Sequence, residues 1–438
     1  MKPKYRLLGL LVAVATGALA MSGSVGASSA LAACAKGLAF EGQGSSLQGI
    51  AQTSVWISGS KCKDTYTASG SAAGLEAFGV GGAKKVNPAD TYIGTDDAPN
   101  GSAITGQLLE MEEASEKAEP VVVPVAQAAI AIIVKPPTGC TVTKIENESL
   151  ESVFSGLTLL WSQIKPMPSG GASCEVEITR VVRLDGSGTT YQFKHYLFEN
   201  KTAALDCTGV TKRTWLQLQE ETVPNTEWPE TGLCNAGEGP VTPLLKSAVK
   251  GGKGEVEEVK KTASSIGYAN LGDAREGYKD TVPAEKLEMY WLEVQNNVKK
   301  IPATYAPPGN KLNAMGVIEE PSLGAEEANC SETKYTNLAK VEKVEIDVDW
   351  SEVNAELAII KTYPICTLTW DVAWELYVLG GIYGATAEEL GEETKSYLEW
   401  VTGNGAGEGQ LEISNKHDYQ KLPAGLSKLA EELAKLVA

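Results

Sequence analysis

The eight residues that begin at Arg183 combine a permanent cation, two glycines and three hydroxyl side chains. They lie between an alternating apolar run at 176–182, which predicts a strand, and the segment 191–198, which predicts a helix. The glycines let the backbone turn, so that free amides and the hydroxyls of Ser187 and Thr189 can converge at the start of that helix. Free amides and the positive end of a helix dipole favour negative charge. Arg183 adds a planar charged fork. The segment therefore predicts a binding site for a tetrahedral oxyanion.

Two further segments have the same character. Gly42–Leu47 and Gly70–Gly74 are rich in glycine and serine, and each lies between a predicted strand and a predicted helix. Asp97 follows a third predicted strand, at 92–95. Each of these turns alone is typical of a tight connection, but together with the segment at Arg183 they predict several loops of donors around one ligand.

The rest of the pattern alternates strands with helices, which predicts an α/β protein. Pro124 interrupts a long β-branched run that has the character of strands crossing between two lobes. Two segments stand apart: 207–243 is loop-rich, and 310–350 is acidic and irregular, typical of an insertion. We expect strands at 37–40, 65–69, 92–95, 121–134, 176–182 and 265–268, and helices at 48–57, 150–154, 191–198, 256–264 and 422–438.

The three loops, Asp97 and Arg183, in this order, resemble the phosphate-binding proteins of bacterial phosphate ABC transporters. Those proteins have the type 2 periplasmic-binding-protein fold, so the resemblance implies two α/β lobes with a ligand cleft between them. It continues through 154–161, 265–268, 363–365, 397–400 and 419–423. Carried over position by position, it implies phosphate contacts from Ser46, the Leu47 amide, Ser71, Asp97, Arg183, Ser187, Gly188 and Thr189, with Asp185 orienting the Arg183 guanidinium.

A carboxylate fits an anion site only when the anion carries a proton. Phosphate near neutral pH can donate a hydrogen bond to Asp97, whereas sulfate would leave two negative oxygens facing each other, at a cost of several kcal/mol. The chain departs from the family at three positions: Ser46 replaces a threonine, Leu47 replaces an aromatic residue, and Asp96 replaces a small polar residue. We expect Asp96 to face solvent or to cap a helix; if it points inward, it changes affinity or ligand choice.

The resemblance also predicts the division of the chain. Residues 1–33, which have three basic residues and then an apolar run, are typical of a secretory signal peptide. Lobe 1 is expected at 34–126 and again at 297–438, with the insertion at about 310–350, and lobe 2 at 127–296. The two lobes are then joined by two crossings of the chain.

Eight cysteines in an exported protein predict disulfides. We pair sequence neighbours because each pair brackets one local excursion of the chain: Cys34–Cys62, Cys140–Cys174, Cys207–Cys234 and Cys330–Cys366. Residues 31–34 also fit a lipid-attachment site at Cys34, although a Ser/Gly-rich spacer separates them from the apolar run. Secretion without a lipid is favoured. No cysteine pair has metal-ligand spacing and the chain has two histidines, so neither a metal nor a cofactor is expected.

The formal net charge of −18 argues against a nucleic-acid partner and implies that an anion is held by short-range hydrogen bonds. The favoured function is an extracytoplasmic monomer that captures inorganic phosphate for an ABC permease. One alternative is a secreted oxyanion scavenger with no transporter. The other is a phosphate-ester hydrolase with Ser187 as nucleophile and His195 as base, but no nucleophile-elbow motif surrounds the serine.

Overall fold

The computed structural model describes most of the chain after the predicted signal peptide. The described residues are 34, 36–79, 86–97, 119–200, 226, 228, 249–279, 288–296, 303–312, 327–341, 344, 349–351, 353–356, 361–378, 381–414 and 417–438. The predicted signal peptide at 1–33 lies outside them. Within them, no helix is long and apolar enough to cross a membrane.

A mixed sheet of nine strands forms the centre of the fold, in the order β2-β1-β3-β11-β4-β7-β6, with β12 and β8 also paired to β4. A smaller sheet has the order β10-β9-β5. The strands are β1 (Ala39–Gly44), β2 (Lys63–Thr67), β3 (Asp90–Thr95), β4 (Pro120–Lys135), β5 (Lys144–Ile145), β6 (Thr179–Arg180), β7 (Ser265–Asn270), β8 (Tyr290–Trp291), β9 (Glu293–Gln295), β10 (Tyr305–Ala306), β11 (Cys366–Trp374) and β12 (Tyr419–Gln420).

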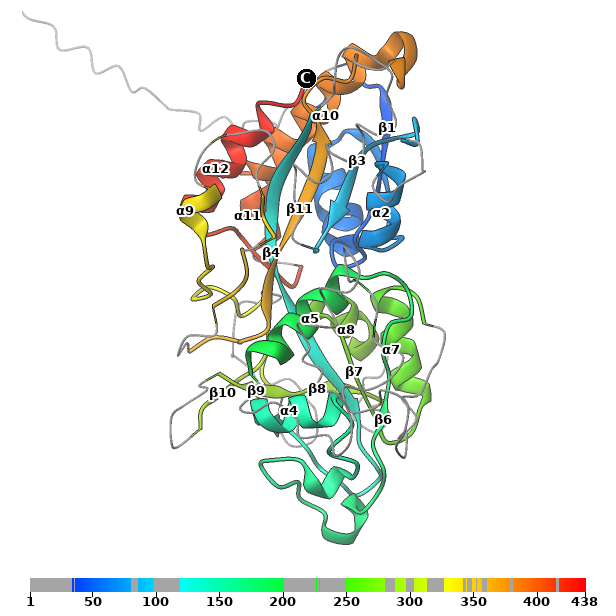
Figure 1. The fold of residues 1–438 in the computed structure, drawn as a ribbon, viewed down its shortest axis with the longest axis vertical. Helices are drawn as coiled ribbons and strands as arrows, with labels where there is room; N and C mark the ends of the chain where they lie inside the picture. Colours follow the sequence, from blue (N-terminus) through cyan, green and yellow to red (C-terminus); the bar gives the residue numbers. More distant parts are fainter. Residues whose placement is uncertain are drawn as a thin grey trace, which may run out of the picture. The chain divides into compact units, whose positions relative to one another are not determined.

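Helices cover the sheet. Those described are η1 (Ala51–Trp56), α1 (Ile57–Ser60), α2 (Ser71–Ala77), α4 (Asn147–Phe154), η2 (Trp161–Gln163), η3 (Gly171–Cys174), α5 (Gly188–Glu199), α7 (Gly251–Lys261), α8 (Leu271–Lys279), α9 (Leu338–Val341), η6 (Gly384–Thr386), α10 (Ala387–Thr402), α11 (Gly409–Ile413) and α12 (Ala424–Ala434). Helix α2 packs on β1 and β3, α12 on β4, and α7 on β7 (Figure 1).

Strand β4 runs through both halves of the sheet as one continuous element (Figure 1). Its residues 120–129 pair with β11, and its residues 130–135 pair with β7. We call the strands on the first half of β4 lobe 1 (β1, β2, β3, β11 and β12) and those on the second half lobe 2 (β6, β7 and β8). Pro124 lies opposite Trp370, where the ladder shifts register, because proline has no amide hydrogen to donate. The expected interruption at Pro124 is therefore an irregularity inside one strand.

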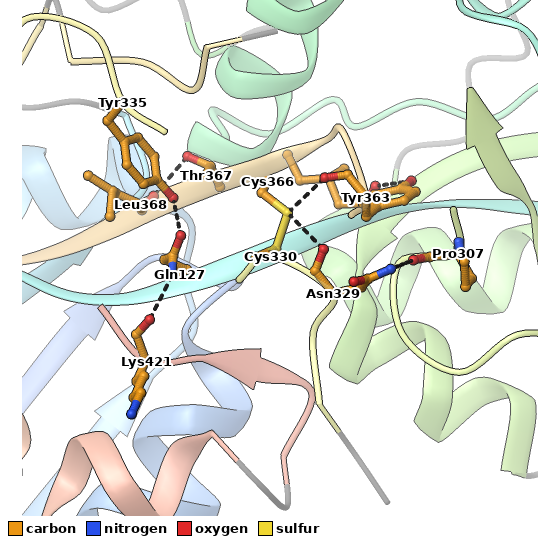
Figure 2. The surroundings of a disulfide bond; sticks show 11 residues. Gln127, Pro307, Asn329, Cys330, Tyr335, Tyr363, Cys366, Thr367, Leu368 and Lys421 are labelled. Carbon is orange, nitrogen blue, oxygen red and sulfur yellow. Dashed lines mark hydrogen bonds between the residues drawn. A yellow bond between two sulfur atoms is a disulfide. The ribbon is translucent and has the colours of Figure 1, made fainter. Parts of the chain in front are cut away.

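The point where β4 changes partner is held by contacts from distant segments (Figure 2). The Tyr363 hydroxyl donates to the Ile130 carbonyl at 2.8 Å, and the Tyr335 hydroxyl donates to Gln127 Oε1 at 2.8 Å. Gln127 in turn donates through Nε2 to the Lys421 carbonyl at 2.7 Å. The disulfide Cys330–Cys366 joins the first residue of β11 to the segment that carries Tyr335. The described part of the predicted insertion is thus fastened to the crossing.

The structure confirms some of the helices and strands predicted from the sequence and contradicts others. The helix predicted at 191–198 is α5, and the strand predicted at 265–268 is β7. The strand predicted at 176–182 is wrong for most of its length, because only Thr179–Arg180 pairs as β6. Strand β11 was not predicted, although it lies at the centre of the sheet and is buried throughout.

Disulfides link the first described residues to the start of β2, and the segment of Cys330 to the start of β11. The structure contains Cys34–Cys62, Cys140–Cys174 and Cys330–Cys366, each of which joins neighbouring cysteines in the sequence. Cys207 and Cys234 lie outside the described residues.

Candidate functional site

The first donor loop follows β1. The strand extends through Gly44, so the loop is shorter than predicted and begins at Ser45. Gly44 has a φ of +130°, and a Cβ there would lie 2.1 Å from the Gly94 carbonyl oxygen, so only glycine fits this close approach of β1 to β3. The Ser45 amide donates to that same carbonyl at 2.7 Å. These contacts fix the backbone that presents the buried Ser46 side chain and the Leu47 amide.

The second loop reaches the segment that carries Arg183. Gly70, at a φ of +103°, donates its amide to the Gly44 carbonyl at 2.7 Å, which joins the first and second loops. A Cβ on Gly70 would lie 2.9 Å from the Gly186 carbonyl oxygen, and the Ala72 amide approaches that oxygen at 3.4 Å. The next residue after Gly70, Ser71, is 1 % exposed.

Arg183 lies in the loop between β6 and α5 and is 1 % exposed. Its Nε donates to Asp185 Oδ1 at 2.6 Å, and its Nη2 donates to Asp185 Oδ2. Its Nη1 donates to Ser46 Oγ at 3.1 Å, so this guanidinium of lobe 2 meets the first loop of lobe 1. Burial acts to lower the pKa of Arg183, but the bond and charge of Asp185 outweigh it and hold the pKa above its ordinary value. Asp185 thus orients the guanidinium, as the resemblance implies.

The third loop begins helix α5. Ser187 is the N-cap of this helix, and its Oγ accepts from the Thr190 amide at 3.3 Å. Gly188 packs tightly against lobe 1, because a Cβ there would lie 2.4 Å from the Asp97 amide nitrogen and 2.6 Å from Ser71 Oγ. Glycine is therefore required for the start of α5 to approach the end of β3.

Asp96 is the carboxylate on which hydroxyl donors from two loops converge. Ser71 Oγ donates to its Oδ1 at 3.2 Å, and Thr189 Oγ1 donates to its Oδ2 at 3.0 Å. Burial is the main influence on its pKa and raises it to about 6, against the bond from Thr189 and the charge of Arg183, which lower it. The expectation that Asp96 faces solvent is wrong: it is 1 % exposed and lies among the residues predicted to bind the ligand.

Asp97 has different neighbours. Burial, and after it the charge of Asp96, raise its pKa to about 8, against the charge of Lys194, which lowers it. The Asp97 carboxyl also contributes to the raised pKa of Tyr191 on helix α5. The predicted contact between Asp97 and a ligand stays a prediction.

Two more buried carboxyls act on Arg183 from lobe 2. Burial raises the pKa of Glu255 to about 8, and the Arg183 charge opposes the shift. Asp273 behaves similarly, with a pKa of about 7. The structure therefore places one arginine among several acids, at a site where the loops present hydroxyl and amide donors. This arrangement can hold an anion by hydrogen bonds, provided that the anion brings protons.

The structure thus brings the predicted residues together from both lobes. Ser46, Ser71, Asp185, Arg183 and Thr189 are joined through hydrogen bonds to one another or to Asp96. Ser187 and Gly188 form the start of α5 beside them. Asp96 and Glu255 were missed as members of this site. The run of two aspartates after a strand gives the only signal for the first, and nothing local signals the second.

The family follows from a match over most of the chain. The model described as "PBP superfamily domain" matches residues 13–326. The chain belongs to the PBP superfamily. No curated protein matches the sequence.

Solved structures show the same two-lobed fold at low sequence identity. The chain is similar to a high-affinity periplasmic phosphate-binding protein, PfluDING, bound with phosphate at pH 8.5, with a TM-score of 0.58, 16% identity and coverage of 89% of this chain and 92% of that one. It is similar to a phosphate-binding protein from Stenotrophomonas maltophilia, with a TM-score of 0.57, 16% identity and coverage of 90% and 93%. It is also similar to an ancestral soluble variant of the human phosphate-binding protein, with a TM-score of 0.57, 17% identity and coverage of 89% of this chain and 92% of that one.

Proposed function

We propose that this protein is an exported solute-binding protein that captures inorganic phosphate and delivers it to an ABC-type importer. The observation that carries the proposal is the bond from Arg183 Nη1 to Ser46 Oγ, which brings a buried guanidinium of one lobe onto the serine loop of the other. A guanidinium, hydroxyls and helix-end amides suit a tetrahedral oxyanion. Structural neighbours that are phosphate-binding proteins support the same ligand.

The proposed contacts to the anion come from three loops and one carboxylate of the Asp96–Asp97 pair. Arg183 supplies the only permanent charge among them, and a ligand placed between the loops would share its Nη1 with Ser46. The remaining contacts are those of the Leu47 amide, Ser71, Ser187, Gly188 and Thr189.

Two observations support binding rather than hydrolysis. The Ser187 hydroxyl accepts a hydrogen bond from the Thr190 amide and caps helix α5. The serine that would act as the nucleophile of a hydrolase therefore has a structural role. Burial lowers the pKa of His195 to about 4, which makes it a weak base near neutral pH.

The disulfides support an exported protein without a lipid anchor. Bonds of this kind persist in oxidising compartments. The Cys34 sulfur is bonded to Cys62, and a sulfur in a disulfide cannot also carry the thioether of a lipid.

Isothermal titration of the purified protein with phosphate and with sulfate tests the ligand. We expect one phosphate per chain and no heat from sulfate near neutral pH. Equal affinities for both anions would contradict the mechanism. Delivery is tested separately with membranes of the source organism, where the phosphate-loaded protein should stimulate ATP hydrolysis more than the phosphate-free protein. Tight phosphate binding with no stimulation would favour the secreted scavenger instead.

A further inference from the structure

The position of Asp96 bears on which form of the anion this site accepts, and the inference below rests on the proposed function. Both oxygens of the Asp96 carboxylate take a hydroxyl donor: Ser71 from lobe 1 and Thr189 from lobe 2. Both hydroxyls also belong to the proposed contacts with the ligand. The carboxylate therefore occupies donors that the anion needs.

Different charges act on the neighbouring carboxyl, Asp97. Charges that act on Asp96 include those of Arg183 and Asp185, whereas those that act on Asp97 are Asp96 and Lys194. Gly188 packs against the peptide between the two aspartates, and the Gln192 amide group donates to the Asp96 carbonyl at 2.9 Å. The backbone that separates the two side chains is thus fixed by α5.

The charge balance at the site is unfavourable to a doubly charged anion. Arg183 is already paired with Asp185, and the buried Glu255 is close enough to act on it. The titratable groups that act on or respond to Asp96 are Arg183, Asp185, Asp97, Tyr66 and Tyr419. Arg183 is the cation among these groups, and Lys194 is the cation that acts on Asp97. Because Arg183 already pairs with Asp185, each further negative charge on the ligand is placed in a buried site without a counter-charge of its own.

We propose that Asp96 is the carboxylate that faces the bound anion, and that it selects tetrahedral oxyanions that carry two protons to donate, such as dihydrogen phosphate. Two ligand hydroxyls replace Ser71 and Thr189 as donors to the two Asp96 oxygens. The two side-chain hydroxyls are then free to donate to the unprotonated ligand oxygens. The number of hydrogen bonds that Asp96 accepts is kept, and the complex gains only one negative charge.

The pKa values are consistent with these roles. Burial raises the pKa of Asp96 only to about 6, so near neutral pH it is ionised and can accept from the ligand. Burial and the charge of Asp96 raise the pKa of Asp97 to about 8, so Asp97 holds its proton there.

The test is isothermal titration with inorganic phosphate at about pH 6.5 and about pH 8.5, which lie near and above the second ionisation of a phosphate group. We expect the Kd of the unaltered protein to rise by roughly 25- to 75-fold over this interval, because the fraction of phosphate in the dihydrogen form falls by that factor for a second pKa of about 6 to 7. Asp96→Asn should flatten that dependence to less than about threefold and admit sulfate, since an amide can donate as well as accept. Asp96→Ser, which removes the carboxylate with a smaller side chain, should do the same.

Two further variants decide the assignment. Asp90→Asn is the matched control: Asp90 is a buried aspartate of β3 whose carboxylate takes donors from Asn87 and Gln43, outside the site, and its substitution should leave the pH dependence and the exclusion of sulfate unchanged. Asp97→Asn should also exclude sulfate; because the pKa of Asp97 is about 8 and falls within the pH interval, this variant is judged by sulfate exclusion alone. If Asp97→Asn admits sulfate while Asp96→Asn excludes it, this inference is overturned and phosphate capture stands. If the unaltered protein binds no phosphate at either pH, the proposed function fails and this inference fails with it.

Discussion

Arg183 and Arg275 are both buried arginines that pair with an aspartate, at 1 % and 2 % exposure. Arg183 pairs with Asp185, two residues further along the same loop, and its remaining Nη1 meets the neutral Ser46 hydroxyl of the other lobe. Because the charged pair lies within one loop, it does not depend on how the lobes meet. The contact that Arg183 makes with the other lobe is a single bond to a hydroxyl, which a ligand oxygen can replace.

Arg275 on α8 is arranged differently. Its Nε lies 2.6 and 2.8 Å from the two oxygens of Asp418, which is 143 positions away beside β12. Its Nη2 donates to Asn310 Oδ1 at 2.7 Å, and its guanidinium lies 5.3 Å from the Trp291 ring centroid. Here the charged pair itself joins α8 of lobe 2 to a segment of lobe 1. The comparison indicates a permanent link at Arg275 and an exchangeable one at Arg183.

The largest effect is expected from breaking the permanent link. Arg275→Ala leaves the buried Asp418 without its cation and should lower the free energy of unfolding by about 3–5 kcal/mol. Urea denaturation measures this loss. Folded Arg275→Ala protein should still bind phosphate. A loss below about 1 kcal/mol would show that the pair does not join the lobes in solution.

Arg183→Ala should weaken phosphate binding rather than lower the free energy of unfolding. Removing the cation leaves the ligand charge unpaired, and phosphate affinity should fall by about 2–5 kcal/mol, measured by titration. Arg183→Lys is the matched control: it keeps the charge, loses the fork that pairs with Asp185, and should recover only part of the affinity. An unchanged Kd in Arg183→Ala would place this residue outside the ligand site.

The disulfide Cys330–Cys366 should contribute to stability rather than to phosphate binding, as the Arg275–Asp418 pair does. Cys330→Ala combined with Cys366→Ala opens a link between residues 36 positions apart and should cost about 2–4 kcal/mol of unfolding free energy. Phosphate affinity should stay within about threefold of the original value. The pair Cys34→Ala and Cys62→Ala opens the link at the amino ends of β1 and β2, the opposite end of these strands from Ser46, and should lose similar stability with the same small effect on affinity. A loss of phosphate affinity above about tenfold in either folded double variant would contradict this separation of stability from binding.

The effect expected from Glu255, which acts on the buried Arg183, is spread over several pH units and is small at each step of pH. Burial raises its pKa to about 8, above the 4.5 of the unfolded chain, so the folded state holds the extra proton between these values. Its contribution to stability is full below about pH 4.5 and falls as pH rises towards 8, by at most about 1.4 kcal/mol per pH unit. Glu255→Gln should flatten the curve of unfolding free energy against pH in that window. An unchanged slope would show that Glu255 is ionised in the folded protein.

The sequence was sufficient for the parts of the site that are local. The segment from Arg183 to Thr189 carries a cation, glycines and a helix cap within a few residues, so its turn and the start of α5 could be predicted. The Arg275–Asp418 link could not, because its partners lie on segments that only the tertiary fold brings together. Strand β11 was missed because it is buried on every residue and lacks the alternation of a half-exposed strand. The order of two adjacent aspartates could not show which one faces Ser71, since that depends on how β3 ends against α5.

A crystal structure of the protein grown with phosphate tests the central claim most directly. The account predicts one tetrahedral anion between the lobes, within hydrogen-bond distance of Arg183 Nη1, Ser46 Oγ and Thr189 Oγ1, with the Arg275–Asp418 pair unchanged. An anion bound elsewhere, with Arg183 still donating to Ser46 and Asp96 still holding Ser71 and Thr189, would contradict it.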